Sequence, residues 1–183
     1  MNDSPEAKSK KAVRDAVAYL KSCGIRLPGF KLTAQPPEKG RIGGSFVTGF
    51  GGELHLNMGR YPTSFIRNWF AMHEIGHVLW ANHRPLRWKD FREAFGEPQP
   101  GNYDAIHKSE SWKTAGTHLL SWYSGPHRPK GQPSWYGARA GGEERFCELI
   151  GLMYAHGDFS KCPPDELTGL WECCWEHGLS RMT

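Results

Sequence analysis

Apolar residues recur at helical spacing in four segments of the chain, and each segment has a recognisable beginning or end. A Ser-Pro pair begins the first segment and a Pro-Pro pair begins the last, as is common in the first turn of a helix. Glycine or proline stands just beyond the end of each segment. Each presents an apolar stripe to a core. The predicted helices span residues 4–23, 62–83, 143–155 and 163–177.

A second pattern, strict alternation of polar and apolar residues, runs from Glu53 to Met58. Alternation with a period of two predicts a half-buried strand. Two further short strands are predicted at 30–34 and 45–48, separated by proline and glycine. These elements predict an α+β fold in a single domain, residues 1–183. In that fold a small sheet packs on the 62–83 helix, with strand 53–58 at the edge of the sheet.

The pattern is least regular between residues 83 and 142. A short helix is predicted around 88–95 and another from about 103 to 122. A loop rich in Pro, Gly and Trp follows from 124 to 142. Long loops in compact domains usually carry function, so this region is expected to contribute to a site.

Composition limits the classes of protein that these elements can form. Hydrophobic residues make up 38% of the 183 residues and aromatic residues 13%, which excludes disorder for most of the chain. The formal net charge is only +4, and basic residues are scattered among acids apart from Lys8, Lys10 and Lys11. We therefore expect no nucleic-acid partner and interpret the lysines as a solvated helix face.

Neither a signal peptide nor a membrane span is predicted, because no apolar segment has the required length. We expect a cytoplasmic protein, although export by a dedicated secretion system would also fit. The five cysteines are odd in number and are expected to be reduced. Three of them, Cys162, Cys173 and Cys174, lie near His177 but lack a C-x-x-C pair, so core thiols are favoured over a second zinc site.

The sequence His-Glu-x-x-His at 73–77 lies in the most apolar of the predicted helices. Residues four apart share a face of a helix, so His73 and His77 can offer two imidazole nitrogens to one metal ion. Glu74 projects beside that ion. Zinc peptidases use this arrangement, with the glutamate taking a proton from a water molecule that the zinc activates. The alternative is that both histidines lie in the core and are hydrogen-bonded to other protein groups. Buried imidazoles need partners, and a metal ion is one such partner.

A zinc site of this kind needs a third protein ligand. The predicted helix 143–155 supplies Glu144 and Glu148, which share a face because they are four residues apart. One of them can bind the metal while the other braces a histidine that binds it.

At this point the sequence resembles the gluzincins, zincin metallopeptidases that include the anthrax lethal factor catalytic domain and the MtfA peptidases. Those proteins carry HExxH, a Tyr-Gly segment, and a helix with Glu followed by aromatic and small residues and another acid. The matching residues here are Trp135-Tyr136-Gly137-Ala138, Glu144, Phe146, Cys147 and Glu148. The resemblance implies a zincin-like (minigluzincin) fold with Glu144 as the third ligand. It also implies that Tyr136 donates a hydrogen bond to the oxyanion of the tetrahedral intermediate.

The resemblance is confined to motifs in the second half of the chain. One extra residue separates Tyr136 from Glu144, and Glu143 becomes the ligand if that residue is not looped out. His83 has the metzincin spacing from His77, but that family needs Gly where Trp80 stands. In regulatory peptidases of the ImmA type, a further alternative, the third acid follows much sooner.

These residues predict a zinc-dependent metallopeptidase that hydrolyses peptide bonds, with Zn²⁺ on His73, His77 and Glu144 and with Glu74 as general base. Strand 53–58 is expected to receive an extended peptide at Leu54, His55 and Leu56. The expected partner is a peptide or protein substrate, and the oligomeric state stays open. Alternatives are a zinc amidase acting on peptidoglycan and a zinc-bound regulator without turnover. A purely structural site needs four ligands and no base, so Glu74 argues against the regulator.

Overall fold

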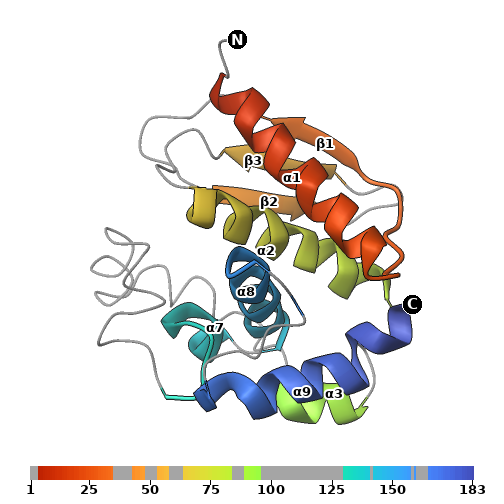
Figure 1. Ribbon diagram of the computed structural model, residues 1–183, viewed down its shortest axis with the longest axis vertical. Helices are drawn as coiled ribbons and strands as arrows, with labels where there is room; N and C mark the ends of the chain where they lie inside the picture. The colour runs from red at the N-terminus through yellow and green to blue at the C-terminus, as the bar shows by residue number, and fades with distance from the viewer. Residues whose placement is uncertain are drawn as a thin grey trace.

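The α2 helix (Ser64–Asn82) lies at the centre of the fold, with a small sheet and α1 on one side of it and α8 on the other (Figure 1). The computed structural model describes residues 4–34, 43–47, 53–57, 64–83, 89–95, 130–140, 142–157, 159 and 165–183. This described part is mostly helical. None of its helices has the length and apolar character needed to cross a membrane.

The remaining elements are arranged around α2. The helices are α1 (Pro5–Ser22), α3 (Lys89–Phe95), α7 (Trp135–Ala140), α8 (Gly142–Ala155) and α9 (Thr168–His177), with short 3-10 helices at Asp165–Leu167 and Leu179–Met182. The strands are β1 (Lys31–Ala34), β2 (Gly43–Val47) and β3 (Glu53–Asn57). The four helices predicted from periodicity are therefore present, and the ends of α1, α2 and α8 lie within two residues of those expected. The last α-helix begins later than expected, at Thr168, because a 3-10 helix occupies Asp165–Leu167.

The first helix illustrates how local signals set these limits. The hydroxyl of Ser4 accepts a hydrogen bond from the amide of Ala7 at 3.2 Å, and Pro5 occupies the first turn. The helix ends before Gly24, which has a φ of +81°, a left-handed conformation that glycine adopts without strain. Val13, Ala16 and Leu20 are buried and form the stripe that packs on the core.

The order of the strands corrects one prediction. β3 lies between β1 and β2, pairing parallel with β1 and antiparallel with β2. Both sides of its backbone ladder are thus occupied, since Leu54 pairs with Leu32 on one side and Phe46 on the other. Strand 53–58 is not an edge strand, and Leu54, His55 and Leu56 cannot receive a peptide by strand addition. Among the described strands, β1 and β2 form the edges, and β2 contacts α2.

Two glycines allow α2 and α8 to approach closely. A Cβ added at Gly76 of α2 would lie 2.8 Å from Cys147 Sγ, and one added at Gly151 of α8 would lie 2.6 Å from Trp69 Cδ1. Neither distance is tolerated by a real side chain, so the small residues determine the spacing of the helices. This contact brings the N-terminal turn of α8 to the histidines of α2.

The predicted loop 124–142 contains a helix that periodicity did not indicate. Within α7, the amide of Gly137 donates to the hydroxyl of the buried Ser134 at 2.9 Å, which caps the N-terminus of the helix. A Cβ at Gly137 would meet Arg145 Cα at 3.2 Å, so α7 rests directly against α8. The predicted 103–122 helix lies outside the described residues.

Candidate metal centre

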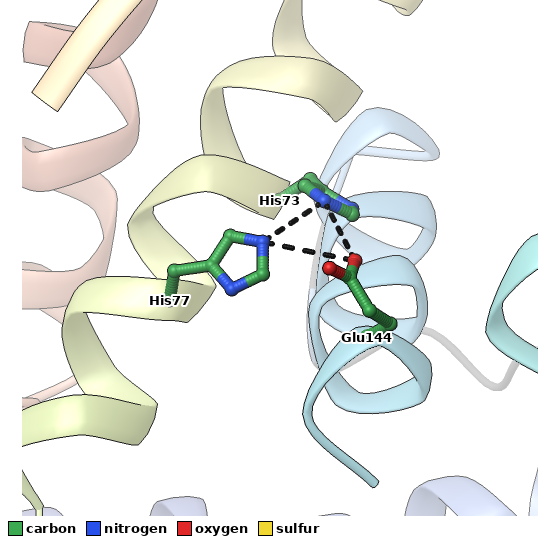
Figure 2. Close-up of side chains that lie close together, drawn as sticks. All are labelled: His73, His77 and Glu144. Carbon is green, nitrogen blue, oxygen red and sulfur yellow. Dashed lines mark hydrogen bonds and ion pairs between the residues drawn. The ribbon is translucent and has the colours of Figure 1, made fainter. Parts of the chain in front are cut away.

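Three side chains from α2 and α8 converge on one point. His73 and His77 project from α2 towards Glu144 of α8, as Figure 2 shows. The Nε2 atoms of the histidines are 3.3 Å apart, and Glu144 Oε2 lies 3.4 Å from His73 Nε2 and 3.7 Å from His77 Nε2. These atoms form a nearly equilateral triangle of two nitrogens and one oxygen.

The triangle has the dimensions of a metal site. Ligands that hold zinc tetrahedrally at about 2.0–2.2 Å lie roughly 3.3–3.6 Å from each other. Glu144 Oε2 is buried and makes no hydrogen bond, and its distances to the two nitrogens exceed the usual length of an N–H···O bond. A buried group of His73, His77 and Glu144 could therefore hold a metal ion. Glu144 occupies the third corner, and Glu143 does not.

Glu148 lies against the other nitrogen of His73. Its Oε1 atom is 3.1 Å from His73 Nδ1, and its side chain is fully buried. The two atoms do not have the geometry of a hydrogen bond, so the carboxylate holds the imidazole through its charge at short range. The sequence predicted that one of these two acids lies at the metal and the other beside a histidine, and Glu144 and Glu148 have these positions.

Glu143 braces the second histidine, a contact that sequence reasoning missed. Its Oε1 atom lies 2.8 Å from His77 Nδ1. A helix places residues 143 and 144 about 100° apart, so the two side chains leave α8 in different directions. Both acids nevertheless reach it because the start of α8 lies across α2, with His77 between them. The adjacent Glu-Glu pair is the only local sequence signal of this contact.

The pKa values of the group reflect its crowded charges. Burial lowers the pKa of His73, but Glu144 and Glu148 outweigh this effect and raise the pKa well above the ordinary value. The pKa of His77 is likewise raised, because Glu144 and Glu143 overcome the effect of burial. Burial raises the pKa of Glu144, yet the two histidines bring it down to about 2. The carboxylate is therefore ionised and the histidines attract a positive charge, which a proton or a metal ion can supply.

Glu74 is also buried and lies on α2 between the two histidines in the sequence. Burial raises its pKa, and the neighbouring His73 and His77 oppose that rise only in part. A carboxylate with a raised pKa is a stronger base than an exposed one, as proton abstraction requires. Glu74 does not belong to the group of potential metal ligands among the described residues.

Tyr136 reaches the group from α7. Its side chain is almost completely buried, and its hydroxyl donates a hydrogen bond to the carboxylate of Glu144. The tyrosine identified from the Tyr-Gly segment therefore lies at the site, although a helix and not a loop presents it.

His83 lies away from the centre. Its amide donates a helical hydrogen bond of 2.8 Å to the Leu79 carbonyl, so α2 continues past Trp80. Its imidazole is hydrogen-bonded to the backbone of Arg26. His83 is not among the described residues that could share a metal ion with His73 and His77, so the metzincin alternative is wrong in its third ligand.

The cysteine cluster has the environment expected of core thiols where the structure describes it. Cys174 is fully buried among apolar side chains, and burial raises the pKa of its thiol well above the ordinary value. Cys162 lies outside the described residues.

Comparison with protein-family models, with curated proteins and with solved structures finds no match to this chain. Its function is therefore inferred from the chemistry of the site.

Proposed function

We propose that this protein is a zinc-dependent metallopeptidase with a zincin-like fold of the gluzincin type. The observation that carries the proposal is the convergence of His73, His77 and Glu144 on one point. Two imidazoles and one carboxylate are a donor set of catalytic zinc, and three protein ligands leave the fourth position open, whereas structural zinc sites are closed by four. The carboxylates behind both histidines are a further property of such centres.

The residues of the chain divide the chemistry of peptide hydrolysis between them. Zinc held by the three ligands would polarise the scissile carbonyl group and activate a water molecule. Glu74 would remove a proton from that water and deliver it to the leaving amine, which its raised pKa favours. Tyr136 would donate a hydrogen bond to the oxyanion of the tetrahedral intermediate, having exchanged Glu144 for the substrate as its acceptor.

The substrate is proposed to be an extended peptide. β2 is an edge of the described sheet and contacts α2, the helix that carries both histidines. A peptide added to this edge as a strand would run beside α2. This assignment replaces the central strand β3, whose ladder is occupied on both sides.

The proposal is tested by cleavage of casein or a peptide library by the purified chain, with and without a chelator. Metal content is measured in parallel. Glu74→Gln should retain about one zinc per chain and lose turnover by at least about 10³-fold, because it removes the base but no ligand. Glu93→Gln, which removes an exposed acid of α3, serves as the control and should be fully active. Protein from zinc-replete cells that contains no metal would contradict the proposal, as would an active Glu74→Gln variant.

Tyr136→Phe separates two roles of the tyrosine. A loss of about 10²-fold in kcat with unchanged zinc affinity would support oxyanion stabilisation. Weaker zinc binding with an unchanged kcat at saturating zinc would instead assign Tyr136 to the positioning of Glu144. Including a cell-wall preparation among the substrates tests for a peptidoglycan amidase, which would replace the peptidase proposal if only that material were cleaved.

A further inference from the structure

A cavity lies between the C-terminal half of α1, Phe159 and α9, and none of its lining residues belongs to the metal group. Its volume is about 450 Å³, within the range of small-molecule sites. Four aromatic residues and two acids provide most of its lining: Tyr19, Phe159, Trp171, Trp175, Glu172 and Glu176. None of the described residues that line it is cationic.

The four aromatic rings form a continuous wall. Consecutive ring centroids are separated by 5.1 Å from Tyr19 to Phe159, 5.2 Å from Phe159 to Trp171 and 6.2 Å from Trp171 to Trp175. Phe159 and Trp171 are buried and form the floor, whereas Tyr19 and Trp175 are half-buried and reach the opening. The hydroxyl of Tyr19 accepts a hydrogen bond of 2.5 Å from the amide of Phe159, which ties the floor to α1.

The acids stand at the opening of this cavity. Glu172 and Glu176 are exposed and lie four residues apart on α9, on the stripe next to that of Trp171 and Trp175. The cavity thus combines an apolar, electron-rich interior with two negative charges at its rim. An apolar or anionic ligand would not use both features.

We propose that this cavity binds an organic cation that carries a trimethylammonium group. Methyl groups form the surface of such a cation, so it is weakly hydrated and enters an aromatic site at a small desolvation cost. The faces of Trp and Tyr attract its positive charge. A primary ammonium or a metal ion would lose strong hydration there without an oxygen-lined pocket to replace it. The carboxylates at the rim add long-range attraction that salt weakens. The proposal is independent of the peptidase activity.

Two sources could supply this group: a choline-like small molecule, or a trimethylated lysine on a protein. Binding to the full chain is measured by calorimetry with choline, with a short peptide containing trimethyl-lysine, and with the unmodified peptide. The neutral control is 3,3-dimethylbutan-1-ol, in which carbon replaces the nitrogen of choline. We expect choline or the trimethylated peptide to bind at least about tenfold more tightly than its uncharged or unmethylated counterpart. The tighter of the two identifies the source.

Variants assign the binding to this cavity. Trp175→Leu should weaken binding about tenfold, and Trp175→Phe, which keeps an aromatic face, should restore much of it. Glu172→Gln and Glu176→Gln should each weaken binding several-fold at low salt, whereas the matched Glu93→Gln variant outside the cavity should not. Circular dichroism establishes that each variant is folded.

Equal affinity for choline and its neutral isostere would overturn the proposal, because the positive charge would then contribute nothing to binding. Absence of binding by every trimethylammonium probe would also overturn it, as would binding that Trp175→Leu and the glutamine variants leave unchanged. None of these outcomes depends on zinc or on peptide cleavage.

Discussion

Two pairs of glutamates with the same spacing occupy opposite environments in this protein. Glu144 and Glu148 lie four residues apart on α8, and Glu172 and Glu176 lie four residues apart on α9. The α8 acids are 8% and 0% exposed, whereas the α9 acids are exposed. The difference is the surface against which each helix packs, since α8 faces the imidazoles of α2 and α9 carries its acids beside tryptophans at an opening.

This comparison shows that a pair of acids has no function of its own. Buried carboxylates are tolerated on α8 because the histidines supply compensating positive charge, and the same need for compensation makes the group a potential metal site. On α9 water compensates the charges, so the acids contribute attraction at a distance and little direct contact energy. Changes on α8 should therefore affect the metal centre, whereas matched changes on α9 should not.

Removal of the third ligand should produce the largest difference. We expect Glu144→Ala to lose zinc retention by at least about 10³-fold and to abolish peptide cleavage, because two imidazoles alone hold zinc weakly. Glu172→Ala on α9 should leave both unchanged. His83→Ala should also be nearly neutral, since its imidazole lies away from the group. Competition with a chromogenic chelator measures the affinity, and zinc binding unaffected by Glu144→Ala would remove that residue from the centre.

Adding a methyl group should destabilise the protein on α8 but not on α9. Gly151→Ala would place a methyl group 2.6 Å from Trp69 Cδ1 and 2.8 Å from the Trp69 carbonyl oxygen. We expect it to reduce the free energy of unfolding by about 2–3 kcal/mol. Gly169→Ala on α9 meets nothing within 4 Å, so it should be neutral or stabilising by up to about 1 kcal/mol. Urea denaturation of both variants provides the measurement, and equal effects would contradict the close approach of α2 and α8.

Loss of the bracing carboxylates should have a smaller effect. Glu148→Gln and Glu143→Gln should each weaken zinc binding by about 10- to 100-fold, because each leaves one imidazole less firmly oriented. The fully buried Glu148 should have the larger effect. Glu172→Gln, a matched change on α9, should leave zinc affinity unaltered. A Glu143→Gln variant with the affinity of the unmodified chain would show that the 2.8 Å contact with His77 contributes nothing.

The dependence of metal binding on pH should be the most gradual effect. The pKa values of His73 and His77 are raised, so without a metal ion these imidazoles hold protons at a higher pH than ordinary histidines do. Zinc needs both nitrogens unprotonated, and its affinity should therefore rise with pH until the raised pKa values are passed. The slope should be about tenfold per pH unit for each proton released. Calorimetry in buffers of different ionisation enthalpy counts these protons, and binding without release near neutral pH would contradict the raised values.

The sequence by itself determined the features that depend on near neighbours. Helical periodicity and end signals located α1, α2, α8 and α9, because capping and amphipathic spacing act over a few residues. The four-residue interval also placed His73 and His77 on one face of α2 before any contact was known. The same interval placed Glu144 and Glu148 on one face of α8. The choice of Glu144 as third ligand and the role of Tyr136 came from the resemblance to gluzincins, and their chemistry at this centre stays a proposal.

Only the tertiary structure decided how these segments meet. The position of β3 between its neighbours depends on pairing between separate segments of the chain, which alternation within one strand does not specify. The convergence of Glu144 on both histidines, and the contact of Glu143 with His77, follow from the close spacing of α2 and α8 at their glycines. The aromatic cavity is likewise formed by residues as distant in sequence as Tyr19 and Trp175. Local periodicity says which face of a helix is buried, whereas the side chain that meets that face is set by packing across the whole fold.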